Sequence, residues 1–295
     1  MRILVAGGSG FLGTALGDNL RRDGHQVSNL TRTPRHHQDL AWSPQSGASA
    51  IPAINEADVI VNLAGESIAG RRWTAARKAA IRGSRVAATR ALAAAIRSAR
   101  RPPPVFISAS GIDIYDAGGS EPVTEDTPPG TGFLASVCRE WEAEALVAAG
   151  RTRVVLLRTA LVLARHGGAL PQIARPFRFF AGGPLGSGRQ YVSWIHLDDW
   201  IGMVRWALAA AVISGPLNVA SLQPVTNREM ARTLGRVLRR PAFLPAPAPA
   251  LRLMLGEMAD ALLLGGRRVV PAKALAHGFE FRYPELEPAL RAVYG

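Results

Sequence analysis

Three glycines near the start of the chain restrict its fold more than any other feature. Gly7, Gly10 and Gly13 come directly after the apolar run Arg2–Ala6 and open the amphipathic stretch Phe11–Asp23. Glycines at this spacing allow a tight turn, a close approach of backbone to a bound pyrophosphate, and close packing of a helix against a strand. The free N–H groups and the dipole at the start of that helix favour a phosphate. The sequence therefore predicts a strand, a phosphate-binding loop and a helix, and favours a dinucleotide site over a purely structural turn.

Short β-branched runs alternate with longer helical stretches through the first half of the chain. Such runs predict strands at Arg2–Ala6, Gln26–Leu30, Leu40–Trp42, Val59–Leu63, Val105–Ser108 and Arg153–Leu157. The longer stretches predict helices at Phe11–Asp23, Trp73–Arg100 and Phe133–Ala149. This alternation is typical of βαβ units. We expect an α/β Rossmann fold, a doubly wound parallel sheet with helices on both faces and a smaller C-terminal substrate lobe.

The second half of the chain has a different texture, with glycine-rich loops from about Gly167 onward. A strand is expected at Tyr191–Ile195, and the acidic pair Asp198-Asp199 is expected to open a helix. Thr226 and Glu229 have the spacing of a capping box before another helix.

These features predict two domains. Residues 1–166 are expected to form the dinucleotide-binding domain, with residues 190–220 returning to it. Residues 167–189 and 221–295 are expected to form the substrate lobe and C-terminal domain, with the proline-rich Pro241–Pro249 as a linker.

Arg32 decides which dinucleotide is expected. NAD enzymes place an acid about 20 residues beyond the glycines to accept the ribose 2′-hydroxyl, whereas an arginine there accommodates a 2′-phosphate. The predicted second strand leads to Arg32, and no acidic residue lies between Asp23 and Asp39. A guanidinium can form paired, charge-assisted hydrogen bonds to that phosphate. The sequence predicts NADP, unless Arg32 is one of many arginines that happens to end a strand.

Arginine carries nearly all of the positive charge of the chain. The chain carries 35 basic and 22 acidic residues, a net charge of +13, and its only lysines are Lys78 and Lys273. No acidic residue lies between Ser67 and Ile112, where arginines are dense. This block predicts a solvated helix face or, alternatively, a surface for an anionic substrate or a polyanion. Because no nucleic-acid-binding motif accompanies it, we expect a small-molecule substrate and no nucleic-acid partner.

Cys138 is the only cysteine, which excludes an internal disulfide framework and suits a reducing compartment. The histidines lack metal-ligand spacing, so no metal is expected. No apolar run approaches the roughly 18 residues of a membrane span, and no signal-peptide core is visible, so we expect a cytoplasmic protein without a membrane partner. Small residues share one stripe of the helix expected at 73–100, which would suit a homodimer: Ala76, Ala80, Ala87, Ala91 and Ala95, beside Trp73.

Several segments resemble a known family. Beside the glycine loop these are residues 58–65, Ser108–Ser110, Leu157–Thr159 and Trp194–Asp199. Together they resemble the extended short-chain dehydrogenase/reductases, the NAD(P)-dependent epimerase/dehydratase group. Four segments are similar, more narrowly, to its small "epimerase family protein" branch, which has its own C-terminal domain: Asn62–Glu66, Arg72–Thr74, Trp141-Glu142 and Gly278–Pro284. The resemblance spans nearly the whole chain.

The resemblance implies further contacts to NADP. Ser9, Phe11 and Leu12 of the glycine loop are expected to contact it, and so are Leu63, Ala64 and Gly65 at the end of the predicted strand Val59–Leu63.

The reaction half of the family pattern is incomplete in this sequence. The family pairs a Ser or Thr with a Tyr and with a Lys four residues after that Tyr. The helix in which the pair belongs, near Phe133–Glu142, contains neither tyrosine nor lysine. Ser110 and Tyr115 match other parts of the pattern. We expect Ser110 to polarise a substrate carbonyl or hydroxyl and Tyr115 to be a substitute proton donor, the alternatives being a serine that turns the strand end and a tyrosine that lines the pocket.

Four other polar residues have weaker claims. Asp113 and Asp116 could act as acid or base but suit a surface turn better. Glu66, directly after Gly65, could act as a base or pair with a neighbouring arginine, Arg71 or Arg72. His196 is expected to be structural.

The sequence thus favours an NADP(H)-dependent oxidoreductase of the short-chain dehydrogenase/reductase type acting on a small molecule. An epimerase of a sugar-nucleotide-like substrate and a non-catalytic NADP(H)-binding redox sensor remain alternatives, because the missing Tyr and Lys would normally supply acid–base help.

Overall fold

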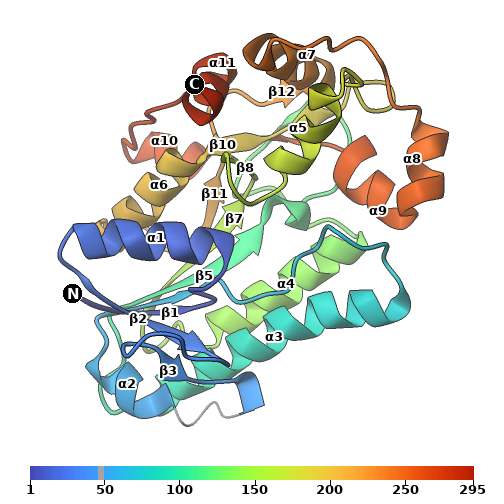
Figure 1. The fold of residues 1–295 in the computed structure, drawn as a ribbon. Coiled ribbons are helices and arrows are strands. Elements are labelled where there is room, and N and C mark those ends of the chain that lie inside the picture. The colour runs from blue at the N-terminus through green and yellow to red at the C-terminus, as the bar shows by residue number, and fades with distance from the viewer. Residues whose placement is uncertain (46–49) are drawn as a thin grey trace.

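The computed structural model describes residues 1–45 and 50–295 and is built around a seven-stranded sheet. All pairs in this sheet are parallel, and the strand order is β11-β7-β5-β4-β1-β2-β3 (Figure 1). Its strands are β1 (Arg2–Ala6), β2 (Gln26–Thr31), β3 (Leu40–Ala41), β4 (Val59–Asn62), β5 (Val105–Gly111), β7 (Arg153–Thr159) and β11 (Gly215–Val219). The expected doubly wound parallel sheet is confirmed.

β5 and β7 each continue beyond the ends that the sequence predicts. They pair with one another as far as Gly111 and Thr159, so each strand keeps its hydrogen-bonding partner past the apolar run. The extension places Ser110 inside a strand, where alternate side chains point to opposite faces of the sheet.

Helices cover both faces of the sheet (Figure 1). The helices of this half are α1 (Phe11–Arg22), α2 (Ile51–Glu56), α3 (Ala75–Ser98), α4 (Phe133–Leu146) and α6 (Leu197–Ala209), with the short 3₁₀ helix η2 (Ile112–Ile114). One core contains Ile3 and Val5 with α1 and α6, and the other contains Leu4 and Ala6 with α2, α3 and α4. Strand alternation therefore divides one apolar run between two cores.

The alanine stripe of the helix predicted at 73–100 is not the face by which α3 packs on the sheet. Among the alanines of that stripe only Ala95 is fully buried, and Ala76 is exposed. The face that packs on the sheet is instead defined by Ile81, Leu92 and Ile96. Large aliphatic side chains gain more from burial than alanines do, so they set the rotation of the helix.

A second lobe packs against the sheet and is built both from segments inserted between the sheet strands and from the C-terminal part of the chain (Figure 1). It contains three two-stranded sheets, β8 (Leu161–Leu163) with β10 (Trp194–His196), β9 (Tyr191–Val192) with β12 (Val225–Thr226), and β6 (Pro122–Val123) with β13 (Arg268–Val269). Its helical segments are α5 (Leu170–Arg178), α7 (Asn227–Leu238), α8 (Ala248–Leu255), α9 (Glu257–Ala259), the π-helical turn η3 (Asp260–Leu264), α10 (Ala272–Ala276) and α11 (Leu286–Tyr294). The capping box expected at Thr226 and Glu229 is confirmed.

The single strand expected at Tyr191–Ile195 is two strands in different sheets. β9 pairs with β12 and β10 pairs with β8, and Ser193 separates them. The Ser193 hydroxyl donates to the Arg267 carbonyl at 2.7 Å and accepts from the Val269 N–H at 2.9 Å. These bonds hold the chain where it passes from one small sheet to the other, which hydropathy alone does not indicate.

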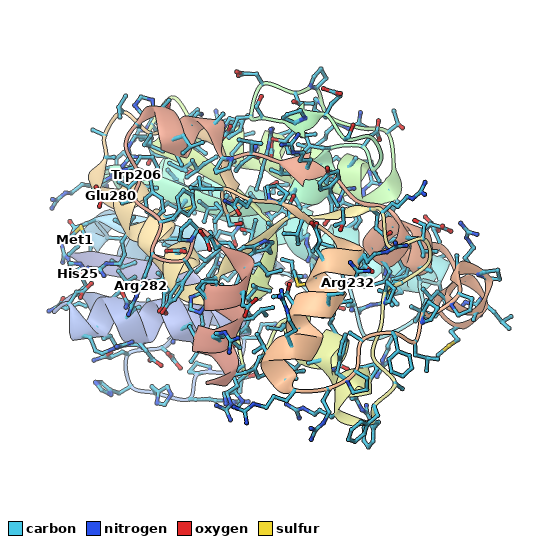
Figure 2. All side chains as sticks on the ribbon, turned by 90° about the horizontal axis from the view of Figure 1, so that it is seen from above. Met1, His25, Trp206, Arg232, Glu280 and Arg282 are labelled. Atoms are coloured by element: carbon cyan, nitrogen blue, oxygen red, sulfur yellow. The ribbon has the colours of Figure 1, made fainter. Side chains whose placement is uncertain are left out.

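The C-terminal segment 278–283 wraps around α6. The Phe279 ring lies 5.5 Å from Trp206 and 4.9 Å from Phe281, and Asp199 accepts the backbone N–H groups of Arg282 and Tyr283. Figure 2 shows Trp206, Glu280 and Arg282 on the same side of the molecule. The aromatic tail that resembles the family branch is therefore a packing element on α6.

None of the helices described in 1–45 and 50–295 has the length and apolar character to cross a bilayer.

Gly13→Ala should destabilise the protein because the helix has no room for a methyl group there. A Cβ atom at Gly13 would lie 2.7 Å from Gly8 Cα and closer still to the Gly7 carbonyl oxygen. Overpacking of this kind costs about 1–3 kcal/mol of the free energy of unfolding. Urea denaturation followed by circular dichroism measures it.

Gly83→Ala is the matched control, since this glycine lies within α3 and a Cβ there would meet nothing within 4 Å. It should stabilise the protein by roughly 0.5–1 kcal/mol. Equal unfolding midpoints for the two variants would contradict the close packing at Gly13.

Candidate functional site

The glycine loop lies where the strand order of the sheet reverses. β1 has β2 on one side and β4 on the other, which makes its carboxyl end a topological switch point, the usual ligand position in such sheets. Gly7 has a φ of 81°, a conformation that favours glycine, and a Cβ there would lie 2.7 Å from the Leu63 carbonyl. The predicted loop residues and the predicted Leu63–Gly65 segment therefore meet at one place.

The start of α1 presents donors without a side-chain cap. Gly10 is the N-cap residue, and no side chain hydrogen-bonds to the first turn from that position. The Gly10 N–H donates to Gly7 O at 3.0 Å, and Thr14 Oγ1 donates to Gly8 O at 3.2 Å, so the loop is fixed by its own backbone. Ser9 and Gly10 are exposed, and Phe11 and Leu12 are half-buried. Open N–H groups beside glycines that tolerate no side chain suit a diphosphate.

The loop after β8 closes on the start of α1, a feature that sequence reasoning did not assign to the site. Gly167 and Gly168 have φ angles of 87° and 69°, and a Cβ at Gly167 would collide with the Phe11 ring. A glycine pair after a strand was the available signal, but nothing in the sequence indicated that it packs against Phe11.

Arg32 lies just beyond β2, the strand next to β1. Its side chain is exposed and, across residues 1–45 and 50–295, makes no hydrogen bond or salt bridge. The nearby Asp39 carboxylate is already engaged by the N–H groups of Arg35 and His36 and by Asn29 Nδ2, at 2.9, 3.1 and 2.9 Å. Burial opposes ionisation of Asp39, but these donors keep its pKa below its ordinary value. The guanidinium, and not this carboxylate, is free to meet a ligand.

Ser110 belongs to a buried charged network. Its hydroxyl donates to Glu142 Oε1 at 2.7 Å, and the same carboxylate accepts Arg158 Nε and Nη2, both at 2.9 Å. Ser110, Glu142 and Arg158 are 6%, 7% and 5% exposed. Burial opposes the charge of Arg158, but the Glu142 carboxylate raises its pKa above the ordinary value. The hydrogen of the Ser110 hydroxyl points to the carboxylate, so its lone pairs remain to accept a bond.

Tyr115 joins this network from the other side of Arg158. Its hydroxyl accepts Arg158 Nη1 at 2.8 Å and donates to Asn218 Oδ1 at 2.7 Å, and the residue is 1% exposed. Burial raises the pKa of Tyr115 to about 12. The Tyr115 hydroxyl thus both donates and accepts inside the protein, whereas the sequence suggested either a substitute proton donor or a tyrosine that lines the pocket.

Sequence reasoning missed most of this network. Asn218 Oδ1 accepts a hydrogen bond from the Tyr115 hydroxyl, and Asn218 Nδ2 donates to the Val270 carbonyl at 3.0 Å. The Glu125 carboxylate accepts hydrogen bonds from the backbone N–H groups of Asn218 and Lys273. For Glu142 the sequence contained one signal of a buried polar role, because this carboxylate lies on the apolar side of a predicted helix.

The two lysines lie elsewhere in the fold. Lys78 forms a salt bridge with Glu257 at 2.6 Å, and Lys273 donates to the carbonyls of Ser214 and Pro216. The α4 sequence Phe133–Leu146 contains no tyrosine and no lysine.

The weaker candidates are all paired. Glu66 pairs with Arg77, whereas the sequence suggested Arg71 or Arg72; Arg77 lies in the first turn of α3, and its guanidinium also donates to the Ser67 carbonyl. Asp113 pairs with Arg267 at 2.7 Å, and Asp116 accepts the Thr131 N–H.

His196 and Cys138 have structural surroundings. His196 Nδ1 accepts the Asp198 N–H at 3.1 Å and caps α6, whose first turn contains Asp198 and Asp199 as the sequence predicts, and burial lowers the pKa of His196. Cys138 is buried, and burial raises the pKa of its thiol to about 12, so it is no thiolate nucleophile.

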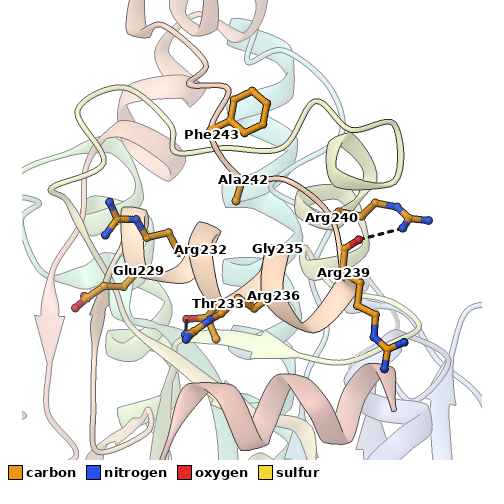
Figure 3. Close-up of a pocket in the computed structure, with 9 residues that line it drawn as sticks. All are labelled: Glu229, Arg232, Thr233, Gly235, Arg236, Arg239, Arg240, Ala242 and Phe243. Atoms are coloured by element: carbon orange, nitrogen blue, oxygen red, sulfur yellow. Dashed lines mark hydrogen bonds between the residues drawn. The ribbon is translucent and has the colours of Figure 1, made fainter.

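A cavity of about 820 Å³ lies in the other lobe, along the C-terminal half of α7. Four arginines contribute to its lining, but Figure 3 shows Arg232, Arg239 and Arg240 pointing away from one another. Arg236 is held by Glu287 and Thr233. Because these arginine side chains do not converge on one point, the cavity does not form an anion-binding site. The carboxyl end of the sheet remains the candidate site.

The loop, the switch point and the free arginine define a dinucleotide-binding α/β protein. Residues 3–220 match the NAD dependent epimerase/dehydratase family, and residues 246–293 match a domain of unknown function, DUF1731. The chain belongs to the NAD dependent epimerase/dehydratase family.

Two relatives that match over nearly their full length are named epimerase family proteins, and a third matches over part of its length. The mouse (Mus musculus) epimerase family protein SDR39U1 is 41% identical over 297 residues, covering 99% of both chains. The crystal structure of human epimerase family protein SDR39U1 with NADPH has a TM-score of 0.94 and 37% identity, covering 100% of this chain and 99% of that one. A nucleoside-diphosphate sugar epimerase from Corynebacterium glutamicum has a TM-score of 0.81 and 30% identity, covering 100% of this chain and 58% of that one.

Glu142→Ala should strongly destabilise the protein, because it leaves the buried Arg158 charge without its carboxylate. Breaking a buried ion pair by removing one partner costs about 3–5 kcal/mol of the free energy of unfolding. Chemical denaturation gives the value. Glu144→Ala is the control on the same helix; its partner Arg90 is exposed, so the unfolding midpoint should barely move. Similar losses in the two variants would show that the buried pair is not special.

Proposed function

We propose that this protein is an NADP(H)-dependent oxidoreductase acting on a small molecule. The observation that carries the proposal is the glycine cradle at the β1–α1 junction, together with the exposed Arg32 guanidinium at the end of the adjacent strand, which is unpaired among the described residues. The human relative whose structure contains NADPH supports the same cofactor.

The residues present fit this cofactor. The N–H groups of Ser9, Phe11 and Leu12 would hold the diphosphate, Arg32 the 2′-phosphate, and the Leu63–Gly65 backbone would border the site. Asp39 could compete as an acceptor for a 2′-hydroxyl, but its oxygens already accept bonds from Asn29 Nδ2 in β2 and from the N–H groups of Arg35 and His36. The nicotinamide ring supplies hydride transfer when the cofactor is bound.

Ser110 is the chain's best group for the proton that accompanies hydride transfer. It lies next to the end of β5, and its hydroxyl hydrogen is already directed at Glu142. A substrate hydroxyl that donates to Ser110 Oγ would therefore pass its proton toward a carboxylate held by Arg158. Tyr115 stays a prediction as an alternative donor.

A non-catalytic NADP(H)-binding redox sensor is the second candidate. The observation that favours it is the burial of Tyr115 together with an α4 sequence that has no tyrosine or lysine. An epimerase of a sugar-nucleotide-like substrate is consistent with the family, and it needs the same acid–base group.

Arg32→Ala should weaken NADPH binding about 10- to 100-fold and leave NADH binding unchanged. The loss corresponds to charge-assisted hydrogen bonds worth about 1.5–3 kcal/mol. Isothermal titration calorimetry measures both affinities. Arg35→Ala is the matched control, since this arginine is exposed in the same loop and, within residues 1–45 and 50–295, only its backbone forms a hydrogen bond. An equal loss of NADPH and NADH affinity would refute the 2′-phosphate contact.

Ser110→Ala should lower kcat/KM about 100-fold or more, with NADPH affinity unchanged, because general acid–base help is worth about 10²–10⁴ in rate. The assay follows NADPH oxidation with a panel of carbonyl and enone compounds.

Tyr115→Phe is the comparison variant and should keep its turnover. A loss of turnover in Tyr115→Phe alone would instead make Tyr115 the proton donor. Wild-type protein that binds NADPH and turns over no compound would favour the sensor.

A further inference from the structure

A group of exposed apolar side chains lies in the second lobe, outside the candidate site. Of the nine phenylalanines in the chain, three are exposed among the described residues: Phe179, Phe180 and Phe243, at 73%, 61% and 77%. Leu244, next to Phe243, is 52% exposed. The two segments lie side by side, because the Leu244 N–H donates to the Gly182 carbonyl at 3.1 Å. Apolar side chains gathered in this way, and not scattered singly, indicate an interaction surface.

Two residues of this region have a backbone conformation that favours glycine. Phe180, just after α5, has a φ of 59°, and Arg239, just after α7, has a φ of 54°; no other non-glycine residue in 1–45 and 50–295 has a positive φ. Helices commonly end on a glycine in this conformation, because glycine has no Cβ. The Arg240 guanidinium lies over the Phe180 ring, 4.8 Å from its centroid. Large side chains kept at strained positions on the surface point to a use for those side chains.

The surface beside these side chains is hollowed into a groove. The cavity of about 820 Å³ along α7 lies next to a second one of about 530 Å³, and the two share three lining residues: Arg232, Ala242 and Phe243. Pro184 and Pro245 add to the apolar wall of the second cavity. Figure 3 shows Phe243 between Arg232 and Arg240, which point in opposite directions. The groove is therefore apolar along its middle and has guanidinium groups on both sides.

Most arginines of this groove have no carboxylate partner. Arginines elsewhere on the surface form ion pairs, as Arg82 does with Glu140 at 2.7 Å. Within the part of the chain that the structure describes, four arginines that line the groove form no salt bridge: Arg228, Arg232, Arg239 and Arg240. Glu229, the acidic residue of the lining, accepts the N–H and the hydroxyl of Thr226 in the capping box. The groove thus has cations whose carboxylates a partner can supply.

We propose that this groove binds an acidic segment of a partner protein, whose apolar side chains pack on Phe180, Phe243 and Leu244. Because the guanidinium groups diverge, each meets a separate carboxylate along an extended segment, whereas a single anion would reach only one of them. A flat anionic bilayer would leave the hollow beside Phe243 unfilled. A nucleic-acid strand follows cations along one track, and these cations lie on both sides of an apolar middle. No residue of the glycine cradle takes part, so the inference goes beyond the proposed function.

The test selects binders to the full chain from a displayed library of random 12-residue peptides, with counter-selection on the double variant Arg232→Gln/Arg240→Gln. The selected peptides should combine several aspartates or glutamates with aromatic or aliphatic residues. Fluorescence anisotropy with a labelled selected peptide then gives Kd. The Kd should rise about tenfold or more in the double variant, because two charge-assisted contacts are lost. It should rise about threefold or more in Phe180→Gly, which loses an aromatic contact.

Two controls separate the groove from general charge and from unfolding. Arg97→Gln/Arg100→Gln removes the same charge from exposed arginines at the end of α3, whose side chains form no bond among the described residues, and it should bind the peptide like wild type. Phe180→Gly places glycine in the conformation that glycine prefers, so its thermal unfolding midpoint should not fall below that of wild type. NADPH affinity should be the same in all of these variants.

Three results would overturn the proposal: no peptide enriched on wild type over the double variant, selected peptides without acidic residues, or an equal loss of affinity in the two arginine pairs. The last result would show attraction by net charge alone. Unchanged affinity in Phe180→Gly would contradict the packing on the aromatic rings. Phosphatidylserine vesicles or an oligothymidylate that bind through Arg232 and Arg240, when no peptide does, would reassign the groove to a membrane or a nucleic acid.

Discussion

The close approach of α1 to the end of β1 is the contact on which the rest of the structure depends. Without a side chain at Gly13, the helix packs directly on the Gly7 and Gly8 backbone, and Gly7 in turn touches the Leu63 carbonyl at the end of β4. This sets the position of the helix N-terminus over the switch point and leaves its N–H groups open. The sheet order and the two cores on its faces then follow from alternation along each strand.

Much of this could be predicted because the signals are local. Adjacent residues determine three of the predicted features: the glycine spacing, the strand Arg2–Ala6 and the helix from Phe11. The structure confirms all three. The family and the fold followed from the same segments. Where the expectation was wrong, as for the single strand at Tyr191–Ile195, a side chain made the difference, since Ser193 bonds to a segment more than 70 residues away.

The buried network shows why the candidate site could be predicted only in part. Ser110 and Tyr115 were identifiable from the segment that follows a strand, but their partners Glu142, Arg158 and Asn218 come from three other elements. No spacing rule joins residues that meet only after the sheet has formed. The same holds for Arg85, which in the sequence is one basic residue in a block of many and in the structure lies over the Trp141 ring of α4.

The Glu125 and Asn218 contacts have a consequence for how the molecule comes apart. Glu125 holds backbone of both β11 and α10, and Asn218 connects β11 to Tyr115 and Val270. Separating the C-terminal segment from the sheet would therefore leave buried polar groups in both parts without their hydrogen-bond partners. Two halves joined in this way lose structure together, as one cooperative transition, even though two separate sequence families meet in the chain.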